Sequence, residues 1–156
     1  MRKSIFVIAA AVVVAAVASY ALSPYLTESE IYEELPDTVL SSDPQGIIKT
    51  YGGTFVGVDD GIHNAEGSVT ALAQVDGSHL LRLENFHSTN GPDLYVYLST
   101  DKGISDFVDL GPLKANQGNQ NYDIPMGTDL DTYDHVLIWC RPFGVLFGSA
   151  QISEIP

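Results

Sequence analysis

The sequence predicts an all-β protein, an antiparallel β-sandwich of about eight short strands that follows one N-terminal transmembrane or signal helix. Three observations support this. The chain is rich in glycine (14) and tyrosine (8), with only 7 lysine and arginine residues, a composition typical of sheets. From about Gly46 onward, short β-branched and aromatic runs alternate with turn-forming residues. A continuous apolar run lies near the N-terminus.

The N-terminal segment, residues 1–22, has the features of a membrane or export signal. Arg2 and Lys3 precede the apolar run Ile5–Ala18. With the residues up to 22 it makes about eighteen helical residues, roughly 27 Å, close to one hydrocarbon core. The basic end should stay in the cytoplasm, which places the rest outside. Small residues at Ala16-Val17-Ala18 also allow cleavage. The protein is therefore expected to be single-pass with an extracellular domain, or secreted.

Residues 23–45 are predicted to be an acidic linker, and residues 46–156 to be the sandwich domain. The linker holds six acidic residues and three prolines, which favours a solvated stalk. Ile31 and Tyr32 offer an alternative, a turn of helix that docks onto the domain. The net charge of −13 argues against a nucleic-acid partner, because the protein would repel phosphates.

Within the domain, strands are predicted near residues 53–58, 68–75, 79–86, 94–99, 107–110, 119–124, 135–140 and 144–152. In 94–99 the apolar residues should face the core, which leaves Tyr95 and Tyr97 on a partly wet face. The run 135–140 is almost wholly apolar and should be a central strand. It ends at Cys140, near the sheet rim and just before Arg141.

Several segments of the domain together resemble the DM-thirteen domain, the electron-transfer domain that Skeletor-type proteins carry beside DOMON domains. The resemblance covers about 100 residues and rests on the segments 53–55, 63–67, 81–86, 91–98, 110–114, 118–125, 136–140 and 143–150. It is most specific in Gly-Pro-Asp-Leu-Tyr-Val-Tyr-Leu (91–98) and in the Trp-Cys end of 136–140. The resemblance implies a β-sandwich, export, and a redox role for the family cysteine, which corresponds to Cys140, as a bare thiol or a haem ligand.

Cys140 is the one cysteine in the chain, so an intrachain disulfide is excluded. A thiolate is a soft ligand for haem iron or copper, and it is the reactive form of a redox thiol. Trp139, Arg141 and His63 are its candidate neighbours. Arg141 could help to stabilise a thiolate, although adjacent strand residues point to opposite faces. One alternative is that Cys140 is a small buried core residue, as most free cysteines are. Another is that it forms a disulfide with a second chain.

The residues also limit the cofactor. Blue copper needs two histidines and one cysteine, and only His63 with one other histidine could supply them, so the ligand count argues against copper. Covalent c-type haem needs a second cysteine. A non-covalent haem on Cys140 remains compatible with the sequence if the domain gives up core volume for it.

The acidic residues give weaker signals. Asp129, Asp131 and Asp134 in one loop, and Asp59 and Asp60 in another, could offer oxygens to calcium, but solvated turns are the favoured interpretation.

No recognisable catalytic constellation is present, so we do not expect an enzyme. Two function classes remain. The first is a membrane-tethered redox or electron-transfer module with an extracellular redox partner. The second is an extracellular structural or binding module, in which Tyr95, Tyr97 or the loops meet a protein or glycan.

Overall fold

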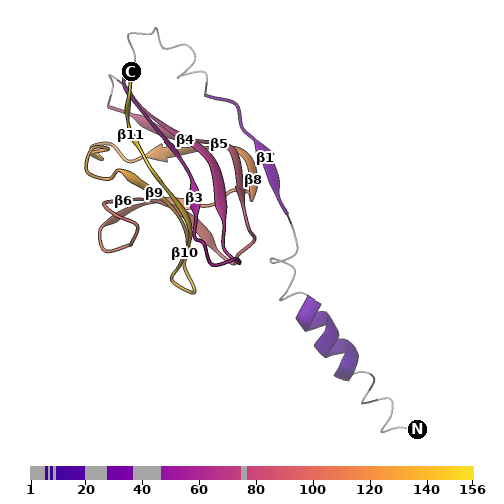
Figure 1. Ribbon diagram of the computed structural model, residues 1–156. Helices are drawn as coiled ribbons and strands as arrows, with labels where there is room; N and C mark the ends of the chain where they lie inside the picture. The colour runs from indigo at the N-terminus through magenta and orange to yellow at the C-terminus, as the bar shows by residue number, and fades with distance from the viewer. Residues whose placement is uncertain (1–5, 7, 9, 20–27, 37–46, 75–76) are drawn as a thin grey trace.

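The computed structural model describes residues 6, 8, 10–19, 28–36, 47–74 and 77–156 (Figure 1). Residues 10–19 form a helix. Among the described residues, no helix is both long enough and apolar enough to cross a membrane. The predicted membrane segment also includes residues 1–5, 7, 9 and 20–22, which lie outside the described residues, as do positions 23–27 and 37–45 of the predicted linker.

The described part of the chain contains eleven strands, where about eight were predicted. They are β1 (Glu30–Tyr32), β2 (Ile47–Thr54), β3 (Val56–Gly57), β4 (Ala65–Gln74), β5 (His79–Ser88), β6 (Leu94–Ser99), β7 (Phe107–Pro112), β8 (Gln117–Ile124), β9 (His135–Cys140), β10 (Val145–Gln151) and β11 (Ser153–Ile155). The two-sheet, almost wholly antiparallel architecture confirms the predicted sandwich. Strands β1, β3 and β11 have only two or three residues each, so they carry little periodic signal. Most of β2 was also not predicted, because the first predicted strand began at residue 53.

The strands form two sheets. The larger has the order β1-β8-β5-β4-β2-β11, and the smaller has the order β3-β10-β9-β6-β7. The prediction of one strand over 53–58 was wrong, because this segment crosses from one sheet to the other. Phe55 forms the corner, with its ring buried and its N–H donating to the carbonyl oxygen of Gly67. The alternation of apolar and polar residues along the sequence does not distinguish a strand that bends between two sheets from a straight strand.

The core lies between the sheets. It takes every second residue of β9 and of β6, together with leucines of β5 and alanine and valine of β4. β9 is the middle strand of its sheet, and the side chains of Val136, Leu137 and Ile138 are fully buried, which confirms the predicted central strand. The same alternation directs Cys140 into the core.

β1 is an edge strand that comes from the predicted linker (Figure 1). It pairs in parallel with β8, with Ile31 opposite Gly118. Glu33 follows it and accepts hydrogen bonds from Lys114 Nζ at 2.9 Å and from the N–H of Asn121 at 2.7 Å. Neither the favoured solvated stalk nor the helical turn therefore describes this short stretch, because pairing with an open sheet edge gives its backbone polar groups partners.

The second tyrosine of β6 lies in a different environment from the one predicted. Leu94, Val96 and Leu98 face the core as expected, but Tyr97 is only 2% exposed. The ring of Phe107 from β7 packs on it, with ring centroids 4.5 Å apart. Tyr97 therefore belongs to a packed aromatic cluster, because the neighbouring hairpin covers a face that the strand alone would leave wet.

Candidate functional site

Cys140 is the last residue of β9, with its side chain 1% exposed. Its Sγ donates a hydrogen bond to the carbonyl oxygen of Pro92 at 3.2 Å. The turn that follows is closed by the N–H of Gly144, which donates to the carbonyl oxygen of Cys140 at 2.9 Å. Gly144 has φ +63°, a conformation that glycine adopts at little cost. Local backbone geometry thus fixes the thiol at the end of a buried strand.

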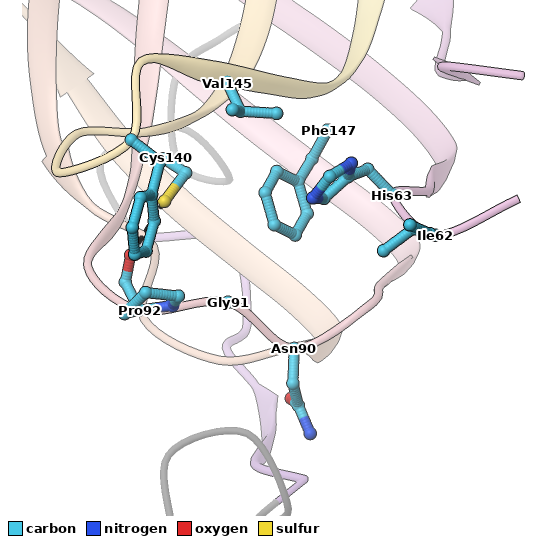
Figure 2. Close-up of a pocket in the computed structure, with 9 residues that line it drawn as sticks. Ile62, His63, Asn90, Gly91, Pro92, Cys140, Val145 and Phe147 are labelled. Carbon is cyan, nitrogen blue, oxygen red and sulfur yellow. Dashed lines mark hydrogen bonds between the residues drawn. The ribbon is translucent and has the colours of Figure 1, made fainter. Parts of the chain in front are cut away.

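The buried thiol forms part of the wall of a cavity of about 560 Å³ (Figure 2). The cavity is lined by Ile62, His63, Asn90, Gly91, Pro92, Cys140, Phe143, Val145 and Phe147. Most of these side chains are aliphatic or aromatic, and none carries a full charge at neutral pH apart from the histidine when it is protonated. Ile62 and Phe143 are 71% and 66% exposed, so apolar side chains extend from the cavity into solvent.

Besides the end of β9 with Cys140, three connections and one further strand build this cavity. They are the β3–β4 loop with His63, the β5–β6 loop with Gly91 and Pro92, the β9–β10 turn and strand β10. The β3–β4 loop is held in place because the N–H of Val58 donates to the carbonyl oxygen of Phe147. A Cβ at Gly91 would come within 2.5 Å of the Phe147 ring, so only glycine lets the β5–β6 loop approach that ring so closely.

His63 is oriented by Asp60. The carboxylate Oδ2 lies 2.6 Å from Nδ1 of His63, and Oδ1 accepts the N–H groups of Ile62 and His63, each at 2.8 Å. The backbone N–H and ring of His63, with the N–H of Ile62, lower the pKa of Asp60 to about 2. The ring of His63 also packs on Phe147, with centroids 4.5 Å apart (Figure 2). The imidazole is therefore held from two sides.

The structure brings two of the four predicted site residues together. Cys140 and His63 line the same cavity, although 77 positions separate them in the sequence. Trp139 and Arg141 do not line it. Trp139 alternates with Cys140 and points to the other face of β9. The guanidinium of Arg141 lies 4.1 Å from the centre of the Tyr95 ring and 3.6 Å from Asp93 Oδ2, so the structure places its charge beside these two residues.

The other metal candidates have local structural partners. Among the described residues, no group of three or more His, Cys, Asp or Glu side chains is placed to hold a metal ion. Asp129 caps its own loop by accepting from the N–H of Asp131 and the hydroxyl of Thr132. Asp131 pairs with Lys49, and Asp134 with the ring of His135. Of the histidines, His63 is the one that lines the Cys140 cavity.

Sequence reasoning missed the apolar walls. Phe147, Phe143, Val145 and Ile62 looked like ordinary strand or loop residues. One signal was available, since the composition of Asn-Gly-Pro-Asp at 90–93 is typical of a turn. Nothing in that motif indicated that the turn would lie against the end of β9.

Comparison with known proteins gives one family match and a small set of alignments with solved structures. The family model described as "Electron transfer DM13" matches residues 55–152. No curated protein matches the chain. Among solved structures, superoxide dismutase 5 of Candida albicans in its Cu(II) form aligns with a TM-score of 0.46 and 9% identity, covering 69% of this chain and 93% of that one. A point mutant of the same enzyme aligns with a TM-score of 0.46 and 9% identity, over 70% and 94% of the two chains.

Proposed function

Because the chain belongs to the Electron transfer DM13 family, we propose that it is a membrane-tethered redox module that works outside the cytoplasm, with the thiol of Cys140 as its redox group. The family supports the redox role in general terms. The position of the sulfur supports the assignment to this residue and to the cavity beside it.

One observation carries the proposal: the single cysteine of the chain is closed to bulk solvent, yet its side chain lines an apolar cavity. A cysteine enclosed by core side chains on all sides would be inert, whereas this one lies at the wall of a cavity, so a small molecule in the cavity needs only a local movement of the wall to reach the sulfur. The redox partner of Cys140 is therefore a group that sits in the cavity, and a large protein cannot contact the sulfur directly.

The sulfur makes its hydrogen bond in the thiol form. It donates to the carbonyl oxygen of Pro92, and a thiolate, which has no proton to donate, would face that oxygen with like partial charge. The nearest arginine in sequence, Arg141, is held over Tyr95 instead. Chemistry at Cys140 therefore begins from a thiol that is hydrogen-bonded to the carbonyl oxygen of Pro92, and loss of the thiol proton breaks this hydrogen bond.

Haem is the cofactor that the family resemblance implies. Cys140 would supply a soft ligand and the apolar walls would suit a macrocycle; a haem held there would carry single electrons. The two propionates fit less well, because none of the nine lining residues is lysine or arginine and the chain carries a net charge of −13. For this reason we favour the thiol itself as the redox group.

The location outside the cytoplasm is supported by the sequence. Arg2 and Lys3 precede the apolar run Ile5–Ala18, and positive residues at one end of such a run retain that end in the cytoplasm. An epitope at the C-terminus of the full chain should be accessible to antibody on intact cells. Access only after the cells are opened would contradict this location.

The first test is the visible absorption spectrum of the full chain, expressed with haem and copper available, before and after reduction. Cys140→Ala is the matched control. We expect no band, and a band that disappears in the variant would make Cys140 a cofactor ligand instead. The full chain is needed, because the predicted domain alone, residues 46–156, would lack β1.

The second test measures access to the thiol. The small reagent methyl methanethiosulfonate should modify Cys140 in the folded protein at least about tenfold faster than the bulky, charged Ellman's reagent, after correction for their rates on free cysteine. Equal slow rates, matching the rate of global unfolding, would show a sealed and inert cysteine. That result would favour a binding or structural module as the function. The partner of such a module would contact residues other than Tyr97, because the ring of Tyr97 is buried.

A further inference from the structure

At the wall of the cavity beside Cys140, the imidazole of His63 is held in a fixed orientation, and its Nε2 is the candidate atom to contact a ligand. An ionised carboxylate can only accept hydrogen bonds, so the proton between Asp60 and His63 belongs to Nδ1 of the ring. In the neutral imidazole this leaves Nε2 as an acceptor. Asp60 is not among the residues that line the cavity, whereas His63 is. The ring therefore turns its occupied nitrogen away from the cavity and keeps the other one for a ligand.

Carboxylate–histidine pairs of this kind fix a tautomer and a ring orientation. Here the orientation is fixed twice, since the ring also packs on Phe147 at 4.5 Å. In the described part of the chain, Nε2 of His63 has no hydrogen-bond partner. A surface histidine that served only its loop would not need a carboxylate partner and an aromatic support at the wall of an apolar cavity.

The walls define the rest of the ligand. Phe147 and Phe143 present aromatic rings, and Ile62, Val145 and Pro92 present aliphatic surface, so the bulk of the ligand should be flat and apolar. An anionic ligand is disfavoured by the charge of −13 and by Asp60 behind the imidazole. A cationic ligand would find no carboxylate in the lining. An uncharged hydroxyl group supplies the donor that Nε2 accepts.

We infer that the cavity binds a small, uncharged, hydroxylated aromatic molecule, a phenol or naphthol in chemical class, whose hydroxyl donates to Nε2 of His63 and whose ring packs on Phe147. The inference deepens the proposed function and rests on it for the role of the cavity, because such a ring would lie against Cys140. Binding itself involves no redox step and needs His63, not the thiol.

The test compares two probes that differ in one group, 2-naphthol and naphthalene. Dissociation constants are measured by probe fluorescence with the full chain in lipid nanodiscs, after subtraction of partitioning into empty nanodiscs. Because a neutral hydrogen bond contributes roughly two- to tenfold in affinity, 2-naphthol should bind about fivefold more tightly than naphthalene. Failure of both probes to bind would overturn the inference, as would equal affinities.

Variants assign the preference to the proposed atom. His63→Phe keeps a ring on Phe147 but removes the acceptor, so the ratio of the two affinities should fall to about one. Asp60→Asn should lower the ratio in part, while Asp59→Asn, which removes the same charge one residue earlier, should leave it unchanged. An undiminished ratio in His63→Phe would overturn the inference. Each ratio comes from one protein sample, so a general loss of folded protein does not imitate the effect.

Two further measurements separate this inference from the redox proposal. In protein labelled with ¹⁵N-histidine, 2-naphthol should shift the Nε2 resonance of His63, and naphthalene should not. The Cys140→Ala variant should still bind 2-naphthol more tightly than naphthalene, with the same ratio of affinities as the wild type. Binding that persists beside an unreactive Cys140 would sink the redox proposal alone. A reactive Cys140 with no probe bound would sink the ligand assignment alone.

Discussion

The guanidinium of Arg141 lies 4.1 Å from the centre of the Tyr95 ring, on the face of β6 and β9 that is turned away from Cys140. Consecutive strand residues point to opposite faces, so an arginine next to a cysteine in sequence need not lie next to it in space. Because its guanidinium lies at the Tyr95 ring, Arg141 is not placed to activate Cys140, and a substitution of Arg141 tests this directly.

Arg141→Gln should change the rate at which methyl methanethiosulfonate modifies Cys140 by less than about twofold, because the charge removed does not face the thiol. The free energy of unfolding should fall by only about 0.5–1 kcal/mol, the usual range for an exposed cation–π contact. Stopped-flow modification and urea denaturation measure the two quantities. A tenfold slower modification would mean that Arg141 reaches the thiol in solution.

Cys140→Ala should lower the free energy of unfolding by about 1–3 kcal/mol, because it removes a buried sulfur and leaves the carbonyl oxygen of Pro92 without its donor. Cys140→Ser keeps a hydroxyl donor and should cost less. Urea denaturation of both variants gives the order. If the Cys140→Ala variant were as stable as the wild type, the hydrogen bond to Pro92 would make no contribution to the free energy of unfolding.

Gly118→Ala should detach β1 from β8. Gly118 has φ +105°, and an added Cβ would overlap the carbonyl oxygen of Ile31. Gly111→Ala is the matched control, because Gly111 has φ +107° and no atom within 4 Å of an added Cβ. Both variants should lose about 1–3 kcal/mol through the backbone conformation.

The loss of β1 should be specific to Gly118→Ala. Hydrogen exchange at the N–H groups of Glu33 and Gln117, which bond across the β1–β8 pair, reports it. Equal protection of these two amides in the alanine variants at 118 and 111 would contradict the predicted clash.

Glu33 should make the attachment of β1 sensitive to acid. Partial burial raises the pKa of Glu33, but the hydrogen bonds from Lys114 and Asn121 and the charges of Lys114 and Arg82 outweigh it, so the pKa is lowered from 4.5. A lowered folded-state pKa stabilises the folded protein above the unfolded value, and this contribution is lost as the pH falls through the folded value.

The measurement is the difference in unfolding free energy between the wild type and Glu33→Gln at several pH values. The difference should be constant from pH 7 down to about 5 and should shrink below pH 4.5, the ordinary value of the group. Glu154→Gln, on the opposite edge of the same sheet, serves as the control for a general effect of charge. A difference that grows on acidification would contradict the assignment.

The sequence predicted those parts of the fold in which a residue's neighbours along the chain decide its environment. Strand β9 and strand β6 were predicted with the bounds observed, because each is a continuous run with a clear pattern of burial. The burial of Tyr97 was not predictable in this way, since it depends on Phe107 of the adjacent strand. The crossing at Phe55 was hidden for the same reason: the buried ring belongs to a corner and not to a strand face.

The candidate site divides similarly. Cys140 could be chosen from the sequence because it is the single cysteine and ends a buried strand, and His63 because it was one of the few ligating residues within reach of a shared site. That the two meet at one cavity depends on how three connections fold over the end of the sandwich. Loops lack a period, so the sequence contains no local signal for which of them will touch.

Strand β1 has a consequence for how copies of this protein behave at high concentration. Without it, the eight residues of β8 would present an open row of backbone donors and acceptors, a template on which another chain could add a strand. β1 covers part of that row, and it is only three residues long and begins with Glu30. Its own outer edge is therefore short and negatively charged. The segment that leads into the domain thus protects the domain against edge-to-edge aggregation.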